Sequence, residues 1–588
     1  MSAPRLIDDL SLMVAGQGGD GSLTLANLVG DLFGRRGFHL YQARNVASRI
    51  KGGHAAAYLR ASVTRRGCLG DRFDLLVGFD HEAIEEGGPL LADDAHVIFD
   101  VSEGPLPDGI LPGAANVLEV PFGRLAVRDL RRDLFKNSLT FGVIGRLLGI
   151  ADPELEEVLR RNLTRLAGPL IEANVQALRR GLEYADGAGI TTGAGPWQLD
   201  VGTSEDRLLI SGNEAAAFGF LAAGGRFFAG YPITPASEIL EWLTRRLPEF
   251  GGVAVQAEDE LSALNLALGA AMTGTRAMTA TSGPGIALMQ EGISHAGSAE
   301  IPVVIVDCQR AGPSTGMPTK PEQGDIGMLV SGSTGDFPRI VLAAGGPADA
   351  FELTVLATNL AAQFQGPVYL ALDQVVSQDA ATVDRFDLDA VQIERGKLLV
   401  EGELAGLDEY RRYLMTDDGI SPWAVPGTVG GQSLITGNER DEWGRVSTKP
   451  ANRVLMIDKR ARKLETLTAL LPEGQRWGDP AAVIGVLGFG MQTGVMREAG
   501  ERLGVQGMVV KGLQVRTLWP VPSDTLAFIE SCERVYVIEH NASAQYRRVL
   551  AGAGAPNAKL RSVLRYDGLP FRPTELAARI VDQEGAGG

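Results

Sequence analysis

Tyr231-Pro232-Ile233-Thr234-Pro235-Ala236-Ser237-Glu238 is the most informative segment of this chain for its architecture. It follows the apolar run 227–230 and precedes a helical pattern that starts at Ile239. It therefore has the position of a loop at the carboxyl end of a strand, where α/β folds place their ligands. Two prolines stiffen this loop and leave the Thr234 hydroxyl between them. A simpler interpretation, a proline-rich turn with Ser237 as a helix cap, also fits these residues alone.

Length and composition indicate a large globular protein. With 588 residues the chain is too long for one hydrophobic core, so about three or four domains are expected. The net charge of −17 argues against a nucleic-acid-binding protein. The cysteines Cys68, Cys308 and Cys532 lie far apart and form no CxxC pair. We therefore expect no iron–sulfur cluster, structural zinc or other metal site in this chain.

Two further absences in the sequence bear on its location. No apolar run of about 18 residues occurs, so we expect no membrane span. The first residues also lack the apolar core of a signal peptide. Together with the separated cysteines, these features favour a cytoplasmic protein without disulfides.

The N-terminal region begins with a strand at 11–15, a glycine-rich turn and a helical pattern over 25–32. Glycines 16, 18 and 21 fit the dinucleotide-binding pattern G-x-G-x-x-G. The acidic residue that would bind the ribose is absent after the second strand, where Gln42-Ala43-Arg44 stands. We therefore expect a loop that packs closely or contacts some other phosphate, and no NAD or NADP site.

The alternation of strands and helices predicts a multidomain α/β protein. We expect a Rossmann-like module at 1–186, a linker at 187–206, a doubly wound domain at 207–385, a connecting segment at 386–478 and a last α/β domain at 479–588. The continuous apolar strand 302–307 is typical of a parallel sheet that is buried on both faces.

Three polar residues follow predicted strands of the second domain: Thr234, Glu260 and Arg310. Since the carboxyl ends of parallel strands share one edge of a sheet, these residues are expected to lie together. A carboxylate, a hydroxyl and a guanidinium make a plausible reaction site. Taken singly, Glu260 also fits a helix N-terminal carboxylate and Arg310 a surface ion pair.

Four motifs together resemble the α subunit of the 2-oxoacid:ferredoxin oxidoreductases, including the 2-oxoglutarate synthases. They are Tyr231–Pro235, Glu258–Asn265, Ala280–Gly285 and Gln309–Gly316. The turn 16–21 with Gly52-Gly53 resembles the γ module of that family, here fused ahead of α. Residues 418–422 and 516–520 extend the likeness, so that nearly the whole chain is covered. The resemblance implies a pyrimidine-type thiamine diphosphate domain at 207–385 and a transketolase C-terminal-like domain at 479–588.

The resemblance also implies the reaction and its partners. The family converts a 2-oxoacid, CoA and two oxidised ferredoxins to an acyl-CoA, CO₂ and two reduced ferredoxins, and the reverse reaction fixes CO₂. Thiamine diphosphate lies between α and a separate β subunit, which carries the diphosphate motif, Mg²⁺ and at least one [4Fe–4S] cluster. The Gly19-Asp20-Gly21 of this chain lacks the paired asparagines of that motif. An (αβ)₂ heterotetramer is expected.

Roles for individual residues follow from the same resemblance. Glu260 corresponds to the glutamate that hydrogen-bonds the pyrimidine ring of thiamine, with Glu258 as the rival position. Pro232 and Ile233 are expected to contact the cofactor. Arg310 is expected to hold the 1-carboxylate of the substrate, with Thr234 on that carboxylate or on the keto oxygen. Lys320 either adds positive charge to the pocket or is an exposed loop lysine.

The substrate and the class of function are left with alternatives. 2-Oxoglutarate is the expected substrate, and pyruvate, branched-chain 2-oxoacids and indolepyruvate are the others, because part of the pocket belongs to β. A protein of another class, a non-catalytic scaffold with the same fold, is disfavoured by the presence of Thr234, Glu260 and Arg310 together.

Overall fold

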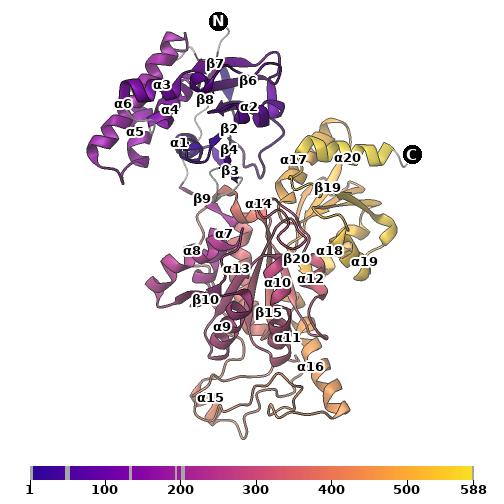
Figure 1. Ribbon diagram of the computed structural model, residues 1–588. Coiled ribbons are helices and arrows are strands. Elements are labelled where there is room, and N and C mark those ends of the chain that lie inside the picture. The colour runs from indigo at the N-terminus through magenta and orange to yellow at the C-terminus, as the bar shows by residue number, and fades with distance from the viewer. Residues whose placement is uncertain (1–3, 47–52, 131–134, 192–194, 200–205, 586–588) are drawn as a thin grey trace. The chain divides into compact units, whose positions relative to one another are not determined.

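The computed structural model describes residues 4–46, 53–130, 135–191, 195–199 and 206–585 (Figure 1). The chain forms two compact units, one comprising Met1–Leu209 with Asp379–Arg385 and the other Ile210–Gln378 with Phe386–Gly588. Both units consist of β-sheets covered by helices. The predicted multidomain α/β class is thereby confirmed.

The first unit contains an eight-stranded mixed sheet in the order β7-β6-β5-β2-β4-β3-β16-β9. Its strands are β2 (Asp9–Gln17), β3 (His39–Val46), β4 (His54–Ser62), β5 (Phe73–Gly78), β6 (Leu91–Asp100), β7 (Asn116–Val120), β9 (Arg207–Ser211) and β16 (Ala380–Asp384). Along β2, Leu12 and Val14 enter one apolar cluster, whereas Met13 and Ala15 enter another. Both faces of the sheet are therefore covered, which explains why β2 has little polar alternation.

The glycine-rich turn lies between β2 and the first helix, as the sequence predicts. Gly21 adopts φ 81°, a left-handed conformation that glycine tolerates. Strand β4 pairs antiparallel with both β2 and β3, so the two strands joined through this turn are not neighbours. The helices of this unit are α1 (Ser22–Arg35), α2 (His81–Gly87), α3 (Phe122–Leu130), α4 (Lys136–Leu147), α5 (Asp152–Asn162) and α6 (Gly168–Gly187).

Two short segments join the first unit from far along the chain. Strand β8 (Trp197–Leu199), inside the expected linker, pairs with β1 (Arg5–Ile7). Strand β16 pairs antiparallel with β3, and Thr382 Oγ1 accepts a 2.8 Å hydrogen bond from the Leu40 N–H. Sequence patterns grouped 379–385 with the second domain, because such long-range pairing leaves no local periodicity.

The second unit is built on a seven-stranded sheet in the order β11-β10-β12-β13-β15-β14-β20. Its strands are β10 (Phe227–Gly230), β11 (Val253–Gln256), β12 (Ala277–Thr281), β13 (Val303–Gln309), β14 (Ile340–Ala343), β15 (Pro367–Asp373) and the antiparallel edge strand β20 (Thr517–Trp519). All seven residues of β13 are buried. This is the doubly wound parallel sheet that the sequence predicts.

Helices cover both faces of this sheet (Figure 1). One apolar cluster joins it to α7 (Gly212–Ala222), α8 (Ser237–Arg246) and α13 (Pro347–Phe364). Another joins it to α9 (Glu260–Met272), α10 (Gly283–Leu288) and α11 (Gln290–Ala299). The helices fix the loops at the carboxyl edge, where the expected site residues lie.

A five-stranded sheet in the order β17-β19-β18-β21-β22 forms the last part of the chain. Its strands are β17 (Gln475–Gly478), β18 (Ile484–Gly488), β19 (Val510–Gln514), β21 (Arg534–Glu539) and β22 (Leu560–Leu564). Its helices are α17 (Gln492–Val505), α18 (Ser523–Glu530), α19 (Gln545–Gly552) and α20 (Pro573–Gly585). Strand β20, from within this region, extends the seven-stranded sheet instead.

The segment between these two sheets has few regular elements, chiefly α15 (Glu401–Ala405) and α16 (Pro450–Leu467). Helix α16 is anchored by Lys459 and Lys463, whose Nζ atoms lie 2.8 Å and 2.5 Å from the carboxylate of Glu300. All three side chains are at most 1% exposed. Burial alone would raise the pKa of Glu300, but the two lysines and Arg412 hold it well below its usual range. The loop-rich segment is thus tied to the sheet by a buried ionic cluster.

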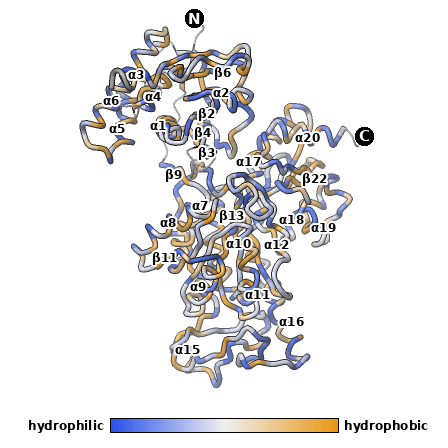
Figure 2. The backbone as a smooth tube through the Cα atoms, in the orientation of Figure 1, coloured by the Kyte–Doolittle hydropathy of each residue, from blue (hydrophilic) through white to orange (hydrophobic). Residues whose placement is uncertain are grey.

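Hydrophobic and hydrophilic stretches alternate along the described chain (Figure 2). Within the described residues, no helix combines the length and the apolar character needed to cross a membrane.

Candidate active site

The carboxyl edge of the central sheet brings together the three polar residues that the sequence placed there. Thr234 follows β10, Glu260 follows β11 and Arg310 follows β13. The Nη1 atom of Arg310 donates a hydrogen bond of 2.7 Å to the backbone carbonyl of Thr234. The charge of Glu260 also acts on the Arg310 guanidinium. One local environment therefore contains all three residues.

Glu260 is the first residue of α9, but its neighbour Asp259 caps the helix. The Asp259 carboxylate accepts a 2.6 Å hydrogen bond from the Ser262 N–H. The Glu260 side chain is only 5% exposed, and no described residue forms a hydrogen bond or ion pair with its carboxylate. Glu258, the rival position, is exposed. A buried carboxylate that lacks a donor is costly, so this one is suited to a donor from outside the chain.

A glycine turn makes room for the Glu260 carboxylate. A β-carbon added to Gly285 would lie 2.6 Å from the Cγ atom of Glu260, and it would also overlap Thr281 Oγ1. Glycine at this position therefore lets the first turn of α10 approach the side chain closely. The motif Ser282-Gly283-Pro284-Gly285 forms the start of α10, and its last glycine has a steric role at this edge.

Arg310 is buried, and part of its guanidinium is available to donate hydrogen bonds to a ligand. It is 8% exposed, and its Nε atom has no hydrogen-bond partner among the described residues. Burial lowers the pKa of Arg310 against the opposing effect of the nearby carboxylates Asp325 and Glu260. A planar guanidinium in such a place suits a planar anion such as a carboxylate.

The loop that carries Thr234 is held by Asn213, a residue that the sequence analysis did not single out. Asn213 is fully buried on α7. Its Nδ2 atom donates a 2.8 Å hydrogen bond to the Pro235 carbonyl, and its Oδ1 accepts from the Cys308 thiol at 3.4 Å. It thereby ties the loop to β13. On the same loop, Pro232 is exposed and Ile233 half-buried.

The chain after Arg310 folds back into a loop that contacts the C-terminal domain. The Lys320 carbonyl accepts a 2.9 Å hydrogen bond from the Ala311 N–H. Lys320 is half-buried, and a β-carbon on Gly568 would lie 3.1 Å from its Cβ atom. Further along, the Gln323 N–H donates to the His540 carbonyl at 2.7 Å, and Gln323 Oε1 accepts from the His540 N–H at 3.2 Å. The C-terminal domain thus fixes the backbone of this loop.

Asp325 is a residue of this edge that the sequence analysis missed. Its N–H donates a 3.1 Å hydrogen bond to Gln309 Oε1, and its Oδ1 atom would lie 2.5 Å from a β-carbon on Gly283. Burial raises the pKa of Asp325 to about 7. Burial, with the charge of Asp325, also raises the pKa of Asp307 well above its usual range. No motif marks Asp325, because it ends an irregular loop and does not follow a strand directly.

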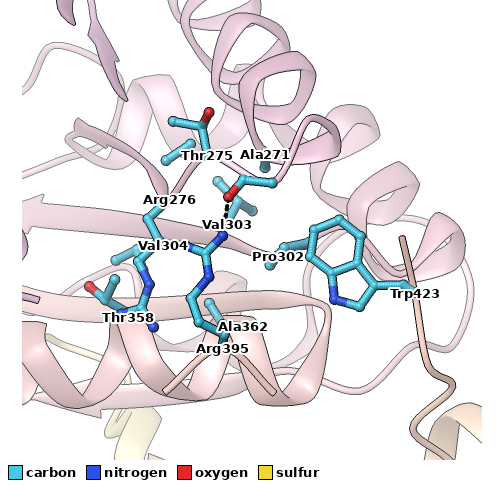
Figure 3. A pocket seen from close by; sticks show the side chains of 13 residues that line it. Ala271, Thr275, Arg276, Pro302, Val303, Val304, Thr358, Ala362, Arg395 and Trp423 are labelled. Atoms are coloured by element: carbon cyan, nitrogen blue, oxygen red, sulfur yellow. Dashed lines mark hydrogen bonds between the residues drawn. The ribbon is translucent and has the colours of Figure 1, made fainter. Parts of the chain in front are cut away.

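A small pocket at the opposite edge of the same sheet is a separate feature (Figure 3). Arg276 and Arg395 both point into it, and Trp423 lies at its side. Arg395 Nη2 donates a 2.5 Å hydrogen bond to the Gly274 carbonyl. The enclosed volume of ≈ 20 Å³ is close to that of one water. This pocket is therefore too small for a substrate or a cofactor.

Comparisons with known families identify the class of protein to which this chain belongs. Residues 219–413 match the model described as pyruvate flavodoxin/ferredoxin oxidoreductase, thiamine diP-bdg. Residues 11–184 match the model described as pyruvate ferredoxin/flavodoxin oxidoreductase. The fold and these matches define the class of protein as a subunit of a thiamine-diphosphate-dependent oxidoreductase.

Individual relatives narrow the family. Over 97% of its length, the chain is 30% identical to the 2-oxoacid:ferredoxin oxidoreductase subunit alpha of Sulfolobus sp, 96% of which is covered. It is 48% identical to the 2-oxoglutarate synthase subunit KorA of Archaeoglobus fulgidus over 33% of this chain and 57% of that protein. The solved structure of 2-oxoglutarate:ferredoxin oxidoreductase from Magnetococcus marinus, with 2-oxoglutarate, coenzyme A and succinyl-CoA bound, matches with a TM-score of 0.92 and 33% identity, covering 98% of this chain and 100% of that one. The chain belongs to the α subunits of the 2-oxoacid:ferredoxin oxidoreductases, so the resemblance seen in the sequence is confirmed.

Proposed function

We propose that this chain, with a separate β subunit, converts 2-oxoglutarate and CoA to succinyl-CoA and CO₂, while two ferredoxins each accept one electron. The observation that carries the proposal is the Arg310–Thr234 pair beside the unpaired Glu260 carboxylate on one sheet edge. The ligands named for the M. marinus structure support this choice of substrate. The 48% identity to a 2-oxoglutarate synthase subunit supports it independently.

The residues at this edge fit thiamine diphosphate. Glu260 offers a buried acceptor without a donor from the described residues, and Pro232 and Ile233 are exposed and half-buried on the loop that also carries Thr234. When bound, thiamine diphosphate supplies the electron sink that decarboxylation of a 2-oxoacid requires. Glu260 would accept a hydrogen bond from the pyrimidine ring of the cofactor and keep a proton at that position.

The substrate would be oriented by groups of this chain that are already fixed. The Thr234 carbonyl holds one Nη atom of Arg310, which leaves Nε and the other Nη to bind the 1-carboxylate as a planar fork. The Thr234 hydroxyl would donate to that carboxylate or to the keto oxygen. Lys320, on the loop that follows Arg310, would add positive charge.

Exposed apolar side chains around this edge support a partner subunit. Tyr231, Leu261, Leu288 and Met317 are 40%, 43%, 51% and 44% exposed. Single exposed apolar residues are ordinary, but these four lie on the loops and helices that carry the site residues. We assign this surface to the β subunit of an (αβ)₂ heterotetramer.

The β subunit would supply the remaining inorganic groups, namely Mg²⁺ and the [4Fe–4S] cluster that passes electrons to ferredoxin. Among the described residues, the three cysteines Cys68, Cys308 and Cys532 are buried and form no disulfide, and they lie far apart in the sequence. Cysteines without disulfides also fit a cytoplasmic enzyme.

The experiment is co-expression with a candidate β subunit of this family, followed by assays of the purified complex. A panel of 2-oxoglutarate, pyruvate, a branched-chain 2-oxoacid and indolepyruvate is tested with CoA and a viologen acceptor. The highest kcat/KM is expected for 2-oxoglutarate. A higher value for another 2-oxoacid would transfer the proposal to that substrate. A complex that binds thiamine diphosphate but converts none of the four 2-oxoacids would favour the alternative, a non-catalytic scaffold.

A further inference from the structure

We propose a divalent-metal site in the N-terminal unit, formed by His54, Glu82 and Glu86, for a first-row cation such as Zn²⁺ or Mn²⁺. His54 begins β4, and the two glutamates lie one turn apart on α2. One ligand atom of each residue lies within 4.8 Å of the others. Because metal–ligand bonds are about 2.1 Å long, small rotations of the exposed glutamates would close these atoms around one ion.

The buried histidine distinguishes this cluster from an ordinary group of surface carboxylates. Its side chain is only 5% exposed, and its Nδ1 atom lies 3.3 Å from Glu86 Oε2. Its buried Nε2 atom has no hydrogen-bond partner among the described residues. A buried imidazole without a hydrogen bond is costly. A metal ion bonded to Nδ1 would satisfy one nitrogen and fix the proton on the other.

The orientation of the ring matches that of a metal-bound histidine. The Nε2 atom of His54 faces Asp80 Oδ1 at 3.4 Å. Asp80 is itself held, since it accepts hydrogen bonds from the Ala83 N–H at 2.8 Å and from Gln17 Nε2 at 3.2 Å. A carboxylate behind a histidine, on the side away from the ion, is the usual arrangement around metal-binding imidazoles.

The charge balance also favours a cation. Three carboxylates, those of Asp80, Glu82 and Glu86, surround one imidazole. Among the described residues, no lysine or arginine forms an ion pair with any of them. A divalent ion would offset most of this negative charge. The competing arrangement is a metal-free cluster in which His54 interacts directly with Asp80 and Glu86.

The donor set indicates the class of metal. One imidazole and two carboxylates suit Zn²⁺ or Mn²⁺ better than Mg²⁺, which prefers an all-oxygen shell. Because Glu82 and Glu86 are exposed, water would complete the coordination. The site would also link β4 to α2, and through Asp80 and Gln17 it would brace the glycine-rich turn. The sequence analysis expected no metal site in this chain, because these ligands come from separate elements and include no cysteine.

The test uses the full-length chain freed of metal with a chelator. Zn²⁺, Mn²⁺ and Mg²⁺ are titrated in turn by calorimetry into the wild type, Glu82→Gln, Glu86→Gln and the control Glu85→Gln, an exposed carboxylate on the same helix outside the cluster. One Zn²⁺ or Mn²⁺ per chain is expected for the wild type and the control. A loss of affinity of at least about tenfold is expected for each ligand variant. X-ray absorption of the zinc form should show nitrogen and oxygen ligands without sulfur.

The outcomes separate the two arrangements. Asp80→Asn should weaken binding about 10–100-fold without removing a ligand. Absence of saturable binding to the wild type would overturn the proposal and favour the metal-free arrangement. Binding that survives in both glutamate variants, or a sulfur ligand in the absorption spectrum, would place the metal elsewhere and equally overturn it. If His54→Gln does not fold, the variants at exposed Glu82 and Glu86 still decide the question.

Discussion

Glu260→Gln is the substitution that tests the proposed mechanism most directly. The amide has the same shape as the carboxylate, so it should fit between Gly285 and Thr281 as the native side chain does. The helix should also survive, because Asp259 and not Glu260 accepts the capping hydrogen bond from Ser262. The change therefore removes one charge and the ability to hold a proton, and it leaves the packing intact.

The expected loss follows from the role of the carboxylate. A positioned acid or base contributes about 10²–10⁴-fold to a rate, which corresponds to about 2.7–5.4 kcal/mol of transition-state stabilisation at 1.36 kcal/mol per tenfold. Because Glu260 is 5% exposed, water has little access to replace it. We expect kcat to fall within that range, with assembly of the heteromer and thermal stability unchanged.

The assay compares the assembled wild type with Glu260→Gln and with the control Glu258→Gln, which changes an exposed carboxylate two positions away. Ferredoxin reduction gives turnover, and exchange of the C2 proton of bound thiamine diphosphate isolates the step that Glu260 should control. If the C2 proton exchanges at the wild-type rate in Glu260→Gln but slowly in Glu258→Gln, the assignment is refuted, and Glu258 takes the role proposed for Glu260.

Four other changes test separate parts of the structure. The Arg310→Lys substitution keeps the positive charge but loses the planar guanidinium. The KM for the 2-oxoacid should therefore rise, and the loss in kcat/KM should correspond to about 2–4 kcal/mol. Loss of thiamine diphosphate binding at an unchanged KM would contradict this prediction. Burial raises the pKa of Asp325 to about 7, and the ionised carboxylate would compete with the substrate for Arg310. In the wild type, the KM for the 2-oxoacid should therefore rise as the pH rises through about 7. The Asp325→Asn substitution should flatten this pH dependence, and a profile that the substitution leaves unchanged would contradict the prediction. Glu300→Gln leaves two buried lysines unpaired and should cost about 3–5 kcal/mol of unfolding free energy in denaturant titrations. The pKa of Glu300 is held below its ordinary value of 4.5, so the stabilisation from this carboxylate is present above that pH and is lost as the pH falls. Below pH 4.5 the unfolding temperature of the wild type should therefore fall more steeply with pH than that of Glu300→Gln. Equal pH dependence of the two unfolding temperatures would contradict this prediction. Finally, the isolated chain should be colourless and inactive, because its cysteines lie too far apart in the sequence to bind an iron–sulfur cluster. A brown isolated protein with iron–sulfur absorbance would contradict this prediction.

The sequence was sufficient for features that local patterns encode. Apolar runs followed by polar residues predicted the strand ends, and parallel pairing then placed Thr234, Glu260 and Arg310 on one edge. The hydrogen bond between Arg310 and the Thr234 carbonyl shows that this inference reached the level of direct contact. It succeeded because each residue lies within a few positions of a strand whose apolar residues are visible in the sequence.

Residues whose position depends on distant pairing were not predictable in this way. Strand β16 joins the sheet of the first unit, and strand β20 joins the central sheet from the C-terminal region. Asp325 reaches the edge only through the course of an irregular loop. Asn213 appears in sequence as an ordinary helix start, and its tether to Pro235 is visible only when α7 is packed against the loop. None of these long-range contacts can be read from a local hydrophobic period.

The C-terminal domain accordingly has a direct part in shaping the proposed substrate site. His540 is fully buried, and burial lowers its pKa to about 3, so the ring stays neutral at physiological pH. Its Nε2 can then donate to the Leu569 carbonyl at 3.0 Å while Nδ1 accepts from Gln492. Held in this way, the His540 backbone exchanges two hydrogen bonds with Gln323, two residues before Asp325. The loop between Arg310 and Asp325 thus owes its geometry to a domain more than 200 positions away, which explains why the two sheets form one compact unit.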